Sequence, residues 1–242
     1  MFKIPDVLEL LKAGAHFGHK ISKWHPKMAP FIFTERNQVH IINLEETQKK
    51  LQVAMNFLRE SAAQNKVILF VGTKDQAQEI ITRHAKDAGV SYVTNRWLGG
   101  LLTNFNEIHI LIKKFRRLKL ERDTGELGKY TKKEQIHIGK EIEKMEKYLS
   151  GIEALERRPD VVFIVDLKKE KTALNEALLC KTKIVALCDT NVNPDKIDYP
   201  IPSNDDAIKT IELIVGLAAE AIKEGKNQTA PAAVAPAVSV PV

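Results

Sequence analysis

Three histidines stand close together near the N-terminus, in the segment HFGHKISKWHP. They are His16, His19 and His25. Two histidines three positions apart can ligate a metal if carboxylates from elsewhere in the chain converge on them. Asp189, at the end of a predicted strand, and Asp205, at the start of a predicted helix, are suitable because ligands gather at the carboxyl ends of α/β strands. The predicted metal set is therefore His19, Asp189 and Asp205, with Asp206 near by.

This predicted site would be structural and would pin the N-terminal segment to the sheet. Zinc or magnesium suits such nitrogen and oxygen donors. The alternative is that the histidines cap or pack, in which case no metal is needed. We expect no cofactor to be required.

Positive charge gathers in two places. The segment KKFRRLKLER concentrates cations on one predicted helix, and HKISKWHPKM combines cations with a tryptophan. Such cations release counterions when they meet a phosphate backbone, and an exposed aromatic ring can stack on a base. The predicted RNA-binding residues are Lys20, Lys23, Trp24, Lys27, Arg96, Lys113, Lys114, Arg116, Arg117 and Lys119. The alternative is that these charges form only a solvated helix face.

The segment TNRWLGGLLTNF places Arg96 and Trp97 before the pair Gly99-Gly100. Two adjacent glycines are more typical of a tight turn than of a phosphate-binding loop. The sequence also lacks a dinucleotide fingerprint, a P-loop and a G-x-S-x-G elbow. We therefore expect Trp97 to stabilise a junction, while Arg96 fits either a junction or RNA.

Composition points to a soluble protein with polyanionic partners. The 242 residues carry a formal net charge of +6, with 44% hydrophobic and 28% charged residues. The two cysteines, Cys180 and Cys188, lie in apolar surroundings that suit free thiols in a reducing compartment. No apolar run approaches the ~20 residues of a membrane helix. These features predict a cytoplasmic protein with no membrane partner.

Continuous apolar runs alternate with helical segments. The runs VILFV, VSYV, VVFIV and KIVALC are typical of strands buried on both faces, and hence of a mainly parallel sheet covered by helices. The predicted fold is a doubly wound α/β domain of the Rossmann or flavodoxin type. A helix is predicted from Pro5 to Gly14, two short strands within 30–44, and a last helix from about Asp205 to Lys223.

A second kind of pattern interrupts the α/β domain. Apolar residues spaced by three and four predict two helices that pack against each other as an antiparallel coiled-coil hairpin. These residues are Ile108, Leu111, Phe115, Leu118, Ile138, Ile142, Met145, Leu149 and Ile152. The predicted organisation is an α/β domain of residues 1–104 and 158–225, a hairpin insertion of 105–157, and a disordered Ala/Pro/Val tail of 226–242.

Ordered motifs across the chain resemble bacterial small-subunit ribosomal protein two. They are LLKAGAHFGH, WHPKM, HIINLEET, NRWLGGLLTNF, PDVVFIVD, CDTN and IPSNDDAI, and the resemblance spans nearly the whole chain. Two departures occur. The family usually has asparagine at His25, and a Gly-Ile-Pro entry where this chain has Lys181-Thr182-Lys183.

The resemblance implies an α/β domain with an inserted helical hairpin, without catalytic activity or a small-molecule substrate. It also implies a structural constituent of the 30S subunit in translation, lying between head and body. There it would bind 16S ribosomal RNA and neighbouring ribosomal proteins, and help to dock ribosomal protein one. Two alternatives stay open. One is an enzyme that binds a nucleotide or sugar phosphate at the Asp189 and Asp205 edge, and the other is a surface adhesin.

Overall fold

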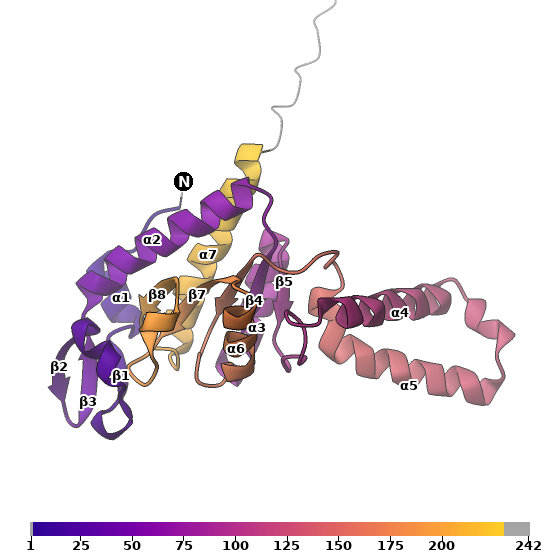
Figure 1. The fold of residues 1–242 in the computed structure, drawn as a ribbon, viewed down its shortest axis with the longest axis horizontal. Helices are drawn as coiled ribbons and strands as arrows, with labels where there is room; N and C mark the ends of the chain where they lie inside the picture. The colour runs from indigo at the N-terminus through magenta and orange to yellow at the C-terminus, as the bar shows by residue number, and fades with distance from the viewer. Residues whose placement is uncertain (1, 230–242) are drawn as a thin grey trace, which may run out of the picture.

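Five parallel strands form the central sheet, in the order β5-β4-β6-β7-β8 (Figure 1). The computed structural model describes residues 2–229. The strands are β4 (Ile68–Val71), β5 (Ser91–Val93), β6 (Val161–Ile164), β7 (Lys183–Cys188) and β8 (Tyr199–Pro202). The chain order changes direction between β4 and β6, as in doubly wound folds of the flavodoxin type. The predicted parallel α/β sheet is therefore confirmed.

Helices cover both faces of this sheet. They are α2 (Leu44–Ala63), α3 (Asp75–Ala88), α6 (Lys171–Leu179) and α7 (Ile208–Thr229). Successive strand residues point to opposite faces. Phe70 therefore packs with α2, α3 and α7, while its neighbour Leu69 packs on the side of α6. Burial on both sides explains why the strand segments read as unbroken apolar runs.

Strand β8 was not predicted, because its sequence YPIP contains two prolines. A proline cannot donate a backbone hydrogen bond, so it is tolerated at a sheet edge but rarely inside a sheet. The structure places β8 at the edge, where Pro200 and Pro202 pair with β7 on one side only. The edge position removes the conflict between the prolines and the strand.

A smaller antiparallel sheet precedes the large one, with strand order β1-β3-β2. Its strands are β1 (Phe17–Lys20), β2 (Ile32–Arg36) and β3 (Val39–Ile42), and α1 (Val7–Ala13) comes before them. The two predicted strands correspond to β2 and β3, whereas β1 falls in the histidine-rich segment for which no strand was predicted. The first helix begins after Asp6, which caps it together with Glu9, and not at Pro5.

Two helices extend away from the sheet domain (Figure 1). They are α4 (Phe105–Asp123) and α5 (Lys132–Leu149). Ile112, Phe115, Leu118 and Ile142 are buried between them, and Thr131 and Glu134 form a capping box at the start of α5. Phe115, Leu118 and Ile142 belong to the predicted apolar positions, and Ile112 joins them.

Five short 3-10 helices complete the described structure. They are η1 (Ile21–Lys23), η2 (Pro26–Phe31), η3 (Glu126–Lys129), η4 (Ser150–Ile152) and η5 (Pro194–Lys196). Among residues 2–229, none of the helices combines the length and apolarity that crossing a bilayer requires.

The last helix runs further than predicted, from Ile208 to Thr229 instead of ending at Lys223. Gly225, in this added part of the helix, is a packing position, because α7 crosses α2 there beside the backbone of Arg59. The predicted tail of 226–242 thus overlaps the end of α7, and residues 230–242 lie outside the described range.

Replacing Gly225 by alanine should lower the free energy of unfolding by roughly 1–3 kcal/mol, as overpacking does in a filled core. The added Cβ would overlap the carbonyl oxygen of Arg59 and press on Ala62. Gly139 is the matched control, because it is also helical but has open space around it. There the same change should stabilise by about 0.5–1 kcal/mol. Equal urea midpoints for the two variants would contradict the close packing of α2 and α7.

Candidate metal site and nucleic-acid interface

His19 and Asp189 meet beyond the carboxyl end of β7. His19 Nδ1 lies 3.0 Å from Asp189 Oδ2, and its Nε2 lies 3.0 Å from Asn191 Nδ2 and 3.9 Å from Asp206 Oδ2. The hydrogen bond to Asp189 raises the pKa of His19, and partial burial opposes this rise. Two of the three predicted metal ligands are therefore adjacent.

Asp206, and not Asp205, completes this group of possible ligands. One atom each of His19, Asp189 and Asp206 lie within 4.8 Å of one another. Both carboxylates contact Lys74, but Asp206 also has an oxygen 3.9 Å from His19 Nε2. The Asp205 side chain is directed inward to Lys74, whose Nζ lies 2.9 Å from its Oδ1. The sequence could not distinguish the two, since both follow the same loop.

Lys74 already supplies a positive charge to this edge of the sheet. Its Nζ lies 2.5 Å from Asp206 Oδ1 and 3.3 Å from Asp166 Oδ2. Burial disfavours its charged form, but hydrogen bonds to Asp206 and Asp205 outweigh burial and raise its pKa. Burial, with repulsion from Asp189 and Asp166, raises the pKa of Asp205 to about 7. Within this edge, the ammonium group holds three carboxylates together.

The donor set of His19, Asp189 and Asp206 suits a zinc ion. Zinc accepts imidazole nitrogen and carboxylate oxygen, and three protein ligands leave one position open. Asp206 is exposed and shares its other oxygen with Lys74, so it is the most adaptable of the three. Asp189 is buried and fixed by the Thr190 backbone N–H.

The predicted N-terminal cations are exposed. Lys20, Lys23 and Lys27 lie around β1 and the two short helices that follow it. Lys27 pairs with Asp195 at 3.0 Å, but both side chains are more than half exposed. The ring of Trp24 is 37% exposed and tilts against His40, at 5.2 Å between centroids. This region therefore presents cations together with accessible aromatic side chains, Trp24 and Phe17.

The cations of α4 divide into two groups. Arg116 donates to the carbonyl of Glu153 and pairs with Glu156 at 2.5 Å, and Lys119 pairs with Glu153 at 2.9 Å. These two side chains join α4 to the segment that follows α5. They are predicted RNA-binding residues for which the structure gives an intrachain role.

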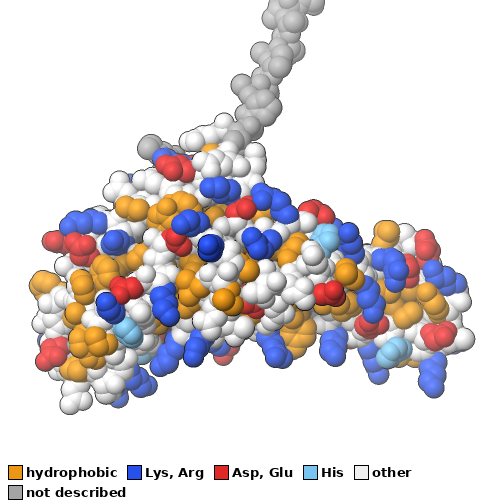
Figure 2. Space-filling view, in the orientation of Figure 1, with side chains coloured by type: hydrophobic (Ala, Val, Ile, Leu, Met, Phe, Trp, Pro, Cys, Tyr) orange, Lys and Arg blue, Asp and Glu red, His pale blue; other side chains and the backbone are white. Residues whose placement is uncertain are grey.

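The other α4 cations face solvent. Lys113 and Arg117 are exposed, and Arg117 has only a 3.7 Å approach to Glu121. Lys114 pairs with Glu141 at 2.6 Å across the helical pair. This contact is largely exposed, so it contributes little to stability. Figure 2 shows Lys and Arg side chains along the whole visible face, over the sheet domain and the helical pair alike.

The glycine-containing junction is organised by a buried carboxylate that the sequence analysis missed. Glu176 accepts from the Trp97 indole at 2.9 Å and from the backbone N–H groups of Gly100, Leu102 and Thr103 at 2.9, 3.0 and 3.2 Å. Trp97 is 8% exposed, so its predicted junction role is confirmed, whereas Arg96 is exposed. The available signal was a glutamate next to Ala173 and Ala177 on the apolar side of α6.

The profile of the ribosomal protein S2 family matches residues 10–225. The chain belongs to the ribosomal protein S2 family. Two relatives carry the name small ribosomal subunit protein uS2. The one from Coprothermobacter proteolyticus is 47% identical over 219 residues, covering 90% of this chain and 82% of the relative. The one from Petrotoga mobilis is 51% identical over 224 residues, covering 93% and 78%.

Membership of the S2 family makes this chain a ribosomal protein with a structural role in translation, and not an enzyme. The alternative of an enzyme at the Asp189 and Asp205 edge is thereby set aside. At that edge the S2 chain instead uses its carboxylates to hold Lys74 and His19.

Proposed function

We propose that the chain is a structural constituent of the 30S subunit that binds 16S ribosomal RNA, and that it acts in the cytoplasm as part of the ribosome. The observation that carries this proposal is the joint presence of S2 family membership and two separate exposed cationic regions. The first surrounds Trp24, and the second follows the outer side of α4. Cations spread over a long surface suit an RNA backbone, which is recognised mainly through phosphates and shape.

The proposal includes a position between the head and body of the subunit and a hairpin that acts as a coiled coil. The position rests on family membership, and the coiled coil is supported by the buried contact of Ile112, Phe115 and Ile142 between α4 and α5. A helical pair held by its own core can carry cations away from the sheet domain without unfolding.

We also propose that the chain contacts neighbouring ribosomal proteins, including ribosomal protein one. Its support is an exposed apolar face beside α1, where Val7, Leu11 and Phe33 are 37%, 46% and 73% exposed. A hollow of about 310 Å³ lies next to it, lined by apolar residues such as Val7 and Ile41. Exposed apolar surface of this extent is typical of protein contact sites.

Salt dependence of sedimentation tests the proposed function. A tagged full chain, expressed in its native cells, should sediment with small subunits at moderate salt and leave them at high salt, because counterion release drives the contact. Recovery only in the unbound fraction at every salt concentration would contradict the proposal.

A structural metal at His19 is a second proposal, supported by the convergence of His19, Asp189 and Asp206. His19→Ala should lower both the zinc content of the purified chain and its melting temperature, because the metal would join the N-terminal segment to the sheet. Asp195→Asn is the control, since Asp195 is an exposed acid outside this group. Zinc content is measured by elemental analysis. A wild-type chain that stays metal-free after zinc loading would rule the site out.

A further inference from the structure

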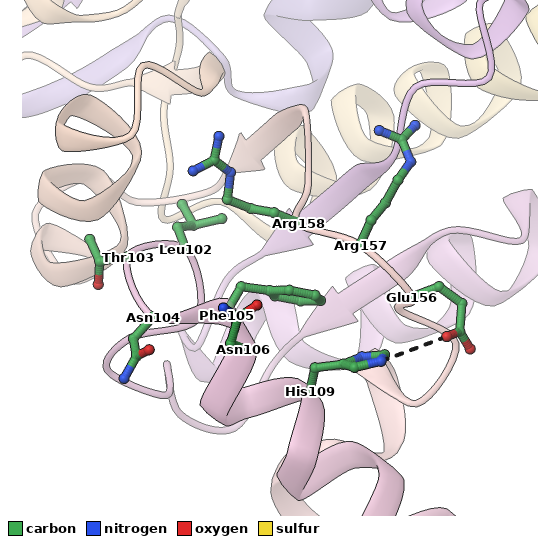
Figure 3. Close-up of a pocket in the computed structure, with 9 residues that line it drawn as sticks. All are labelled: Leu102, Thr103, Asn104, Phe105, Asn106, His109, Glu156, Arg157 and Arg158. Carbon is green, nitrogen blue, oxygen red and sulfur yellow. Dashed lines mark ion pairs between the residues drawn. The ribbon is translucent and has the colours of Figure 1, made fainter.

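A hollow of about 470 Å³ opens where α4 leaves the sheet domain (Figure 3). It lies between the start of α4 and the segment that leads into β6. Its lining includes an aromatic ring, a histidine, two asparagines and two arginines, which are Phe105, His109, Asn104, Asn106, Arg157 and Arg158. None of these residues belongs to the predicted RNA-binding set, so the hollow is a separate feature.

The ring of Phe105 provides an aromatic surface in this hollow. It is half-buried and stacks on His109, with centroids 5.6 Å apart and an interplanar angle of 30°. In the view of Figure 3 the ring lies between His109 on one side and Arg158 on the other. A nucleobase is a flat ring that stacks on such a surface whatever its sequence.

Arg158 is the open cation of the hollow. Arg157 is held elsewhere, by Asp160 at 2.8 Å and by the Asn65 carbonyl at 3.0 Å. Glu156 also lines the hollow, and its negative charge is engaged by Arg116 and approached by His109 Nε2 at 3.9 Å. Arg158 is exposed, and within residues 2–229 it forms no ion pair. Its charge is therefore available to a phosphate.

The start of α4 contributes the positive end of its helix dipole to the same place, and the exposed Glu107 in its first turn offsets part of that charge. The side chain of Asn104 occupies the N-cap position but makes no capping hydrogen bond. A helix start carries partial positive charge and favours phosphate. This end of α4 thus adds to the charge of Arg158, and the exposed amides of Asn104 and Asn106 can reach base edges.

The exposed α4 cations continue from the hollow along one line. Lys113 and Arg117 follow Asn106 by seven and eleven positions, which at about 100° per residue places all three on one side of the helix. The rise of 1.5 Å per residue separates Asn106 from Lys113 by about 10 Å. A chain of phosphates can therefore pass from the hollow to these cations, which a free mononucleotide could not do.

We propose that this hollow receives one nucleotide of an RNA strand, with its base on Phe105 and its phosphate at Arg158 and the α4 N-terminus, and that the strand continues along Lys113 and Arg117. The proposal rests on the proposed function and adds a nucleotide site to it. It assigns a binding role to Phe105, Asn106 and Arg158.

Photo-crosslinking tests this site in assembled subunits. Asn106 is replaced by the photoreactive residue benzoylphenylalanine, small subunits containing the full chain are irradiated, and RNA adducts are mapped by reverse transcription. We expect adducts at one short stretch of 16S RNA. The same residue at Lys209, which is exposed on α7, is the control. Subunits that contain the variant but give no RNA adduct at Asn106 would overturn the site and leave the proposed function standing. A chain that never enters subunits would overturn both.

Charge reversal of Arg158 provides the quantitative test. Arg158→Glu should weaken binding of the full chain to 16S RNA about tenfold at moderate salt. It should also reduce the slope of log affinity against log salt by about one, as loss of one phosphate contact predicts. Lys209→Glu should change neither. An unchanged slope for Arg158→Glu would overturn the phosphate assignment. Uridine monophosphate provides the last comparison. If it binds saturably to the wild-type chain, and Arg158→Glu weakens that binding but not the binding of 16S RNA, the proposal of a continuous strand is overturned.

Discussion

Glu176→Ala should lower the free energy of unfolding by roughly 3–5 kcal/mol, because several buried donors lose their charged acceptor at once. Glu176 holds the Trp97 indole, three backbone N–H groups and the Thr103 hydroxyl. In a chain of this size, that loss corresponds to a fall of roughly 6–20 °C in melting temperature. Thermal unfolding followed by circular dichroism measures it.

Asn175→Ala is the matched control, since Asn175 is the exposed neighbour on α6 and its removal should change stability by less than about 0.5 kcal/mol. Glu176→Gln should fall between the two, because an amide retains the size but offers only one acceptor oxygen to donors on both sides. A Glu176→Ala protein as stable as Asn175→Ala would refute the view that this carboxylate organises the junction.

The pH dependence of the same contact has a definite sign. Burial raises the pKa of Glu176, but the hydrogen bonds from Trp97 and the loop outweigh burial, so its pKa is lowered from the ordinary 4.5. For an acid with a lowered folded-state pKa, the stabilisation is complete above the unfolded value and disappears as pH falls through the folded one. The difference between wild type and Glu176→Gln should therefore narrow below about pH 4.5.

The sheet was predictable because its physical signal is local. A strand buried on both faces is apolar along its length, and VILFV and VVFIV satisfy this condition throughout, whereas VSYV and KIVALC each contain one polar residue. Strand β8 shows the limit of that reasoning. Pro200 and Pro202 oppose a strand locally, and only the pairing with β7, the preceding strand of the chain, at the edge of the sheet decides for it.

The candidate sites were likewise predictable only in part. Histidine spacing brought attention to His19, and positive charge to the α4 cations, but which neighbour each side chain meets depends on tertiary packing. Asp205 and Asp206 both bind Lys74, but Asp206 is the one that also approaches His19. In the same way Arg116 turns to Glu153 while Arg117 faces solvent, although the two are adjacent in a cationic run. Sequence fixes the charge of such residues and leaves their direction open.

Reversing Lys113 and Arg117 together to glutamate should weaken binding to 16S RNA by roughly 10- to 100-fold at moderate salt and reduce the salt slope by about two phosphate contacts. Both side chains are exposed, and Arg117 has only a distant partner, so the fold should be unaffected. Reversing Arg116 would not be a clean test. A glutamate there would lose the Glu153 carbonyl and repel Glu156, so stability and binding would change together.

Lys171→Glu with Lys209→Glu is the control pair for this experiment. It removes the same charge from exposed positions, and glutamate near the starts of α6 and α7 is compatible with the helix dipoles. Net charge falls equally in the two double variants, so a purely global electrostatic attraction predicts equal losses of affinity. A contact along α4 predicts a loss confined to the Lys113 and Arg117 pair. Equal RNA affinities and slopes for the two double variants, with unchanged melting temperatures, would show that the outer side of α4 is not a main RNA contact.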